Sequence, residues 1–263
     1  MTDESKRKSK DPLEIVPLKT NASKIKNPPL CETLGIKHPF SMGIIGSSGS
    51  GKTVLCSNFL LNKQLFYRYF DKIYILSPSG SIDDSFAGLK IPKDQVVTDN
   101  FIEKLEEIIE EQKGKIENCS EDEAPDLSKA EKVLIIFEDL SAQVKLMNSK
   151  AFKIIFTQNR HLCVSVIAIV HKYKQLMRMA RLNASHLMLF RCSATEIDAL
   201  YTEHGTSQSK KEFYQMVEDS FAPDEFSERP FIWINNKSAP YQRFRKCLKY
   251  IYTLNNKNEI KPE

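Results

Sequence analysis

The stretch Gly46-Ser47-Ser48-Gly49-Ser50-Gly51-Lys52-Thr53 decides how the rest of this chain is interpreted. An apolar segment, residues 39–45, precedes it and indicates a short buried strand. Residues 54–61 follow it and carry apolar side chains at helical spacing. A glycine-rich loop between a strand and a helix is the context that a P-loop requires. A flexible Ser/Gly linker is the alternative, but a linker would not sit between a buried strand and an amphipathic helix.

The residue types in this loop suit the binding of a nucleoside triphosphate. Small residues let the backbone curl so that successive N–H groups point inward at phosphates, and the amino end of the following helix adds positive potential. Lys52 is expected to reach the β- and γ-phosphates, and the Thr53 hydroxyl is expected to ligate Mg²⁺. The candidate ATP-binding residues are therefore Gly46, Ser47, Ser48, Gly49, Ser50, Gly51, Lys52 and Thr53.

A second signal is the apolar run at residues 132–139, which ends in Glu138 and Asp139. A continuous apolar run is typical of a strand buried on both faces of a parallel sheet. The carboxyl ends of such strands carry the ligand chemistry of α/β proteins, and in P-loop enzymes an acid here holds Mg²⁺. A solubilising acidic turn is the alternative, but the upstream loop favours the catalytic interpretation.

The remaining segments alternate between strand and helix patterns, which predicts an α/β fold with a mostly parallel, right-handed sheet. Further strands are expected at residues 72–77, 162–170, 185–190 and 230–235. Helices are expected at residues 101–115, 194–201 and 210–221, and a helix or turn at residues 151–160. The strand at 162–170 ends in the polar residue His171.

The length of 263 residues suits one large domain with extensions. Residues 1–30 are polar and contain prolines, which predicts a flexible arm. Residues 31–225 are expected to form the P-loop ATPase core. Residues 226–263 are expected to form a strand and a basic tail that pack on the core or extend from it. A basic cluster in the arm could contact DNA or act as a localisation signal, but a solvated tail is the favoured interpretation. The basic tail favours a terminal helix with its cations reaching solvent over a nucleic-acid grip.

Composition narrows the functional class only slightly. The net charge of +4 permits contact with nucleic acid without proving it. No apolar run is long enough to cross a membrane, and the first residues do not resemble a secretory signal. The six cysteines lie far apart without metal-like spacing, which indicates reduced and mostly buried thiols in a cytosolic protein.

Residues 35–192 resemble the genome-packaging ATPases of large nucleocytoplasmic DNA viruses and virophages, in the FtsK/HerA branch of P-loop motors. The resemblance is carried by the P-loop, by residues 135–139, by Arg160-His161 before a strand, and by Arg181-x-Asn183 before the next strand. It implies a RecA-like, additional-strand P-loop fold in three layers. In that fold the strand at 162–170 lies between the P-loop strand and the acidic strand.

The resemblance also implies roles for single residues. Glu138 would share Mg²⁺ with Thr53, and Asp139 would activate the attacking water. His171 would sense the γ-phosphate, although a histidine at the edge of the core is a serious alternative. Arg160 and Arg181 are candidates for the arginine that a neighbouring subunit supplies, and each could instead be a surface cation.

The implied activity is ATP hydrolysis with Mg²⁺, coupled to translocation of double-stranded DNA. The implied partners are a homo-oligomeric ring, DNA bound without regard to sequence, and a capsid or portal-vertex protein in the host cytoplasm. Two departures bear on these roles. The family usually ends its acidic strand with Asp first or with two Asp, and it usually has Gln at the sensor position. Here the acids are Glu138 and Asp139, and the sensor candidate is His171.

Two other functions remain open from the sequence. A small-molecule or nucleoside kinase would also use a P-loop, but the sequence contains no compact arginine-rich lid motif. A non-hydrolysing assembly protein would use the nucleotide as a structural switch.

Overall fold

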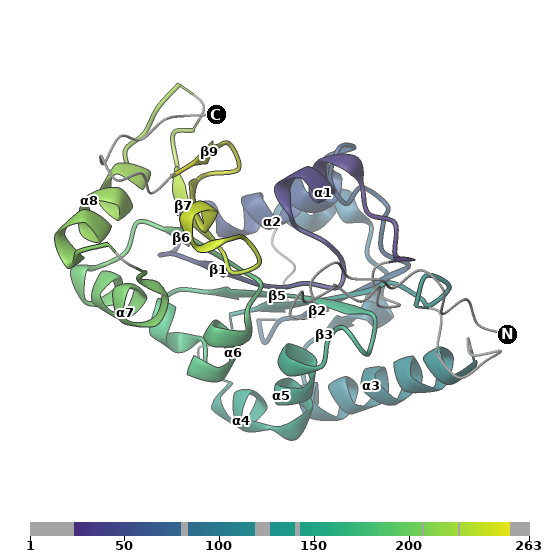
Figure 1. The fold of residues 1–263 in the computed structure, drawn as a ribbon. Helices are drawn as coiled ribbons and strands as arrows, with labels where there is room; N and C mark the ends of the chain where they lie inside the picture. Colours follow the sequence, from purple (N-terminus) through teal and green to yellow (C-terminus); the bar gives the residue numbers. More distant parts are fainter. Residues whose placement is uncertain are drawn as a thin grey trace, which may run out of the picture.

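In the computed structural model, the described residues are 24–79, 84–118, 127–139, 143–206, 208–225 and 227–252. Within these ranges the strands form one nine-stranded sheet with the order β3-β2-β4-β5-β1-β6-β7-β8-β9 (Figure 1). The strands are β1 Ser41–Ile45, β2 Lys72–Leu76, β3 Val96–Val97, β4 Val133–Glu138, β5 Val164–Val170, β6 His186–Phe190, β7 Phe231–Asn235, β8 Phe244–Lys246 and β9 Tyr250–Ile251.

The centre of this sheet is parallel. Strand β5 pairs in parallel with β4 on one side and with β1 on the other, and β1 also pairs in parallel with β6. All residues of β1 and β5 are buried, as expected for parallel strands that are covered on both faces. The predicted position of β5, between the P-loop strand and the acidic strand, is confirmed.

Helices cover both faces of the sheet (Figure 1). They are α1 Pro29–Leu34, α2 Lys52–Leu61, α3 Phe101–Asn118, α4 Val144–Asn148, α5 Lys150–Thr157, α6 Arg178–Asn183, α7 Ala194–His204 and α8 Lys210–Ser220. Short 3-10 turns are η3 Asp84–Leu89, η4 Lys93–Gln95, η6 Tyr173–Gln175 and η7 Pro240–Gln242.

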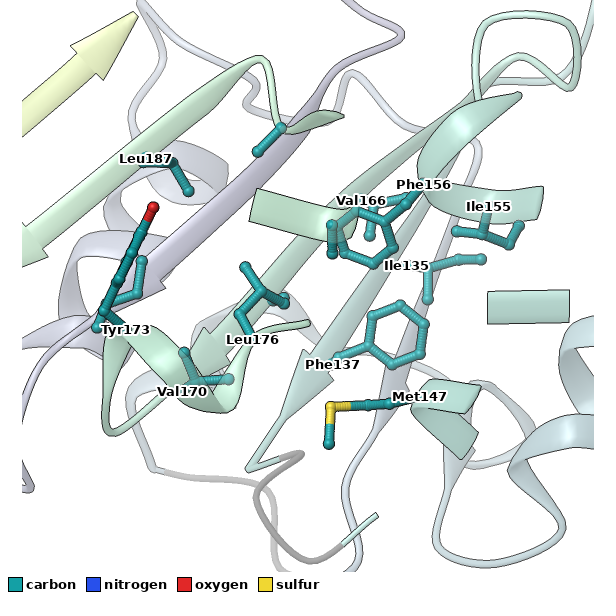
Figure 2. Packing of buried hydrophobic residues seen from close by; sticks show 14 of the residues in the cluster. Ile135, Phe137, Met147, Ile155, Phe156, Val166, Val170, Tyr173, Leu176 and Leu187 are labelled. Carbon is teal, nitrogen blue, oxygen red and sulfur yellow. The ribbon is translucent and has the colours of Figure 1, made fainter. Parts of the chain in front are cut away.

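Alternate residues of β4 divide the core into two layers, because successive strand side chains point to opposite faces. Ile135 and Phe137 join the cluster that includes helices α3, α5, α7 and α8, and Figure 2 shows Phe137 beside Phe156 of α5. Leu134 and Ile136 join the other cluster, under α1 and α2. The expected three-layer arrangement of helix, sheet and helix follows from this alternation.

The prediction that the basic tail forms a terminal helix is wrong. The tail instead forms β8 and β9, which extend the sheet in antiparallel fashion from β7. The Arg245 guanidinium lies 4.6 Å from the centroid of the Trp233 ring, and Lys246 pairs with Asp224 at 2.9 Å. The backbone groups at the edge of β7 offer hydrogen-bonding partners to the tail, and no local pattern in the tail reveals them. The tail therefore forms paired strands instead of a helix.

The predicted boundary after residue 30 does not mark a break in the structure. Ile25, inside the range assigned to the arm, is buried in a cluster with Ile116, Leu127, Ala130 and Cys163. Strand β7 belongs to the same sheet as β1. The basic cluster of the arm (Lys6, Arg7, Lys8 and Lys10), Cys119 and the last residues of the tail lie outside the described residues.

In the part of the chain that the structure describes, no helix combines the length and the apolar character needed to span a membrane. Cys31, Cys56 and Cys163 are buried free thiols, whereas Cys192 and Cys247 are partly exposed.

Candidate functional site

The loop at residues 46–53 lies between the carboxyl end of β1 and the amino end of α2. Gly49 has a φ of 72°, and Gly51, the residue that caps α2, has a φ of 102°. Residues other than glycine rarely adopt these backbone angles. A Cβ on Gly46 would lie 2.6 Å from the Ser50 hydroxyl oxygen and 2.8 Å from Cβ of Phe190. Glycine is therefore required at these turns for the backbone to curl as the motif predicts.

Lys52 is buried, with 7% of its surface exposed, and its Nζ donates to the carbonyl oxygen of Ser47 at 2.8 Å. Burial lowers the pKa of the Lys52 ammonium, and the charges of Asp139 and Glu138 oppose this effect. Both carboxylates therefore act electrostatically on the lysine of the loop. The fold thus brings together two motifs that lie far apart in the sequence.

The acids reach the loop through the register of the sheet. Glu138 is level with Ile169 of β5, and Ile169 is level with Ile44 of β1, two residues before the loop. One intervening strand puts the two backbones roughly 10 Å apart. Asp139 follows β4 with a φ of 50°, so it has left the extended conformation that would place its side chain strictly opposite to that of Glu138.

His171 lies beside one of these acids. Its Nε2 is 3.7 Å from Oδ1 of Asp139, and the two side chains are 39% and 53% exposed. Each residue directly follows its strand, and β4 and β5 are neighbours. The accessible position of the imidazole argues against the alternative of a core histidine, so the sensor role stays a prediction that the geometry permits.

Arg181 is not available as the arginine that acts on a neighbouring subunit, and that candidate role is wrong. Its side chain is only 8% exposed, and its Nε and Nη2 donate to the two carboxylate oxygens of Glu203 at 2.9 and 2.6 Å. Its Nη1 donates to the carbonyl oxygen of Leu176 at 2.5 Å. These bonds hold the guanidinium inside its own subunit, where it serves the fold.

Arg160 lies at the opposite edge of the sheet from the loop. It is exposed and precedes the amino end of β5, whereas the loop follows the carboxyl end of β1, which runs parallel to β5. The length of β5, at about 3.3 Å per residue, puts roughly 20 Å between the two edges. Arg160 is too far from its own loop to contact a nucleotide there, so its predicted role requires a second subunit.

Arg229 lies at the loop although no sequence motif marks it. Its Nη1 donates to the carbonyl oxygen of Gly49 at 2.7 Å, across a sequence separation of 180 residues. No pattern around Arg229 points to the loop, because the contact depends on the pairing of β7 with the sheet.

The residues present fit a bound triphosphate. The Ser50 hydroxyl oxygen is buried and has no hydrogen-bond partner within the described ranges, so a phosphate oxygen suits it. In the same ranges no three His, Cys, Asp or Glu side chains could hold a metal by themselves. Mg²⁺ often binds through one or two carboxylates together with phosphate oxygens and water. Thr53 and Glu138 fit this mode when nucleotide is bound.

Comparison with known proteins decides the family. The model of the family described as Poxvirus A32 protein matches residues 32–262. This chain belongs to that family. The predicted resemblance to viral genome-packaging ATPases is thereby confirmed at the level of the family.

Relatives of this family member include the DNA packaging protein OPG160 of Variola virus, which is 25% identical over 185 residues. The alignment covers 69% of this chain and 64% of that protein, so the chain spans less than two thirds of the length of this relative. The homologous protein of Monkeypox virus is also 25% identical over 185 residues, which make up 58% of its length.

Two solved structures resemble the fold. The DNA-packaging ATPase B204 of Sulfolobus Turreted Icosahedral Virus has a TM-score of 0.53 and 13% identity, and the match covers 80% of this chain and 97% of B204. The genome packaging NTPase B204 of Sulfolobus turreted icosahedral virus 2, solved with ATP-gammaS, also has a TM-score of 0.53 and 13% identity, with 79% and 96% covered. The α/β P-loop fold with a mostly parallel central sheet is confirmed.

Proposed function

We propose that this protein is an ATP-hydrolysing motor that moves double-stranded DNA into a viral capsid. The observation that carries the proposal is the sheet register, which places Glu138 and Asp139 one strand away from the loop that holds Lys52. Membership of the Poxvirus A32 family and the packaging role in the names of its relatives support the same activity.

The chemistry assigned to the loop side of the site is binding. Loop amides and Lys52 hold the triphosphate, and in phosphoryl transfer most of the catalysis is such positioning and charge stabilisation. Thr53 and Glu138 would hold Mg²⁺, which would neutralise charge on the phosphates. Glu138 is the last residue of β4, and its carboxylate would be the protein's charged ligand to the ion.

The chemistry assigned to the other side is activation of water. Asp139 accepts a proton from the attacking water, because its carboxylate is exposed and lies past the end of the strand. His171, 3.7 Å from that carboxylate, orients it and detects the γ-phosphate. Arg160 of a neighbouring subunit adds positive charge at the transition state, so the active form is a homo-oligomeric ring.

Double-stranded DNA passes through the ring, and a capsid or portal-vertex protein receives it in the host cytoplasm. Contacts with the phosphate backbone carry no sequence information and release counterions. We therefore expect DNA binding to be independent of sequence and to weaken steeply as the salt concentration rises.

Steady-state ATP hydrolysis with and without linear double-stranded DNA tests the proposal. We expect turnover in the presence of Mg²⁺ and a clear increase when DNA is added. Turnover only with a small phosphate acceptor would instead indicate a kinase. Nucleotide binding without turnover, with or without DNA, would indicate a nucleotide switch. Either the kinase result or the switch result would contradict the proposed motor function.

Two substitutions separate the roles of the acids. Asp139→Asn is expected to lower turnover by about 10²-fold or more, the effect of removing a general base, while Mg²⁺-dependent nucleotide binding persists. Glu138→Gln is expected to raise the Mg²⁺ concentration needed for half-maximal turnover, because a neutral amide is a weaker ligand. Magnesium titrations of both variants make the comparison, and an exchange of the two phenotypes would reverse the assignment.

A further inference from the structure

Arg229 reaches the phosphate-binding loop because of the direction of β7. Strand β7 pairs antiparallel with β6, so that Phe231 is level with Phe190, and β6 runs parallel to β1. The amino end of β7 therefore lies at the same edge of the sheet as the carboxyl end of β1. Arg229 stands two residues before Phe231, and its Nη1 is 2.7 Å from the carbonyl oxygen of Gly49.

This contact sets the orientation of one peptide group of the loop. A trans peptide bond is planar, so the C=O of Gly49 and the N–H of Ser50 point in opposite directions. While Arg229 holds the carbonyl oxygen of Gly49, the Ser50 N–H points the opposite way, toward Ser47. There it donates to the carbonyl oxygen of Ser47 at 3.2 Å, the same oxygen that accepts from Nζ of Lys52.

The loop restrains this orientation by one hydrogen bond of its own, from the Ser50 N–H to the Ser47 carbonyl oxygen. Gly49 has a φ of 72°, and a Cβ built there would meet nothing within 4 Å, so no packing restrains the peptide from that side. Glycine also gives the backbone more freedom than any other residue. A charged donor is stronger than a neutral one, so a guanidinium is well suited to hold this peptide in one orientation.

We propose that Arg229 is a positioning residue for nucleotide binding, which fixes the Gly49–Ser50 peptide group in the loop that takes the phosphate chain of a nucleoside triphosphate. The proposal rests on the proposed function in so far as the loop must bind such a ligand. Arg229 acts from its own subunit, in contrast to Arg160. Because the side chain of Arg229 is exposed, it contributes little to the packing of the fold.

Equilibrium binding of a fluorescent, non-hydrolysable ATP analogue with Mg²⁺ tests the proposal on the full chain. Arg229→Ala is expected to raise Kd about tenfold, the typical effect of losing one charge-assisted hydrogen bond. Arg229→Lys, which keeps a charged donor, is expected to recover part of the affinity. The melting temperature without nucleotide is expected to stay at the wild-type value in both variants.

Arg191→Ala is the matched control, because Arg191 is an exposed arginine that directly follows β6 at the same edge of the sheet. It is expected to bind the analogue like the wild type. Equal Kd values for Arg229→Ala and wild type would overturn the proposal. Equal losses in Arg229→Ala and Arg191→Ala would overturn it as well, because they would indicate an effect of net charge.

A lower melting temperature of nucleotide-free Arg229→Ala, not restored in Arg229→Lys, would assign Arg229 to the fold instead. Failure of the wild-type protein to bind the analogue would be a different result. It would overturn the proposed function and, with it, the ligand on which this proposal depends.

Discussion

Replacement of Lys52 by alanine is expected to lower ATP turnover by at least about 10²-fold, the size of effect seen when one preorganised donor is removed from a transition state. The charges of Glu138 and Asp139 act on the pKa of this ammonium, which donates a hydrogen bond to the loop carbonyl of Ser47. Its loss removes charge stabilisation of the γ-phosphate and releases the loop from that contact. Steady-state turnover with saturating ATP and Mg²⁺ measures the effect.

The matched control is Lys63→Ala, because Lys63 is exposed and lies just beyond the opposite end of α2. It removes the same side chain at a distance from the loop, and turnover is expected to stay near the wild-type value. A Lys52→Ala protein that hydrolyses ATP at the full rate would exclude this loop as the catalytic site, whatever the rest of the fold resembles.

Replacement of Glu203 by alanine is expected to lower the free energy of unfolding by about 3–5 kcal/mol, the usual effect of breaking a buried ion pair by removing one partner. Glu203 is only 9% exposed and accepts hydrogen bonds from Arg181 and, at 2.5 Å, from the Tyr173 hydroxyl. Its removal leaves a buried guanidinium without its carboxylate. Urea unfolding at pH 7, followed by circular dichroism, measures the difference.

The same carboxylate predicts how this difference depends on pH. Burial raises the pKa of Glu203, but hydrogen bonds from Arg181 and Tyr173 outweigh this effect, and the net shift is downward from 4.5. A lowered pKa in the folded state stabilises the protein fully above the unfolded value and less as the pH falls through the folded value. The difference between wild type and Glu203→Ala is therefore expected to shrink below about pH 4.5.

Two further variants make this experiment specific. Glu218→Ala removes an exposed glutamate from α8 and is expected to change the free energy of unfolding by less than about 0.5 kcal/mol. Glu203→Gln keeps the shape and an acceptor oxygen but not the charge, so it is expected to fall between wild type and Glu203→Ala. Equal stabilities of Glu203→Ala and Glu218→Ala would show that Arg181 does not need its partner.

The core of the fold and part of the candidate site can be predicted from the sequence. The loop, its flanking strand and helix, and the acidic strand are local patterns, set by small residues and by apolar side chains at fixed spacing. The position of β5 between β1 and β4 followed from the resemblance that these patterns support. Glu138, Asp139 and His171 could be assigned to one edge because parallel strands end together.

Other features depend on which strand pairs with which, and the sequence by itself did not determine them. Nothing in the local sequence distinguishes Arg181 from an exposed arginine, yet Glu203, on a different helix, holds it inside the protein. The basic tail has no strong strand pattern, yet the edge of β7 pairs with it. Arg229 meets Gly49 only because β7 runs antiparallel to its neighbour. The local spacing of residues determines the helices and strands. Long-range strand pairing and burial decide which distant charged side chains meet, because both exist only when the whole sheet has formed.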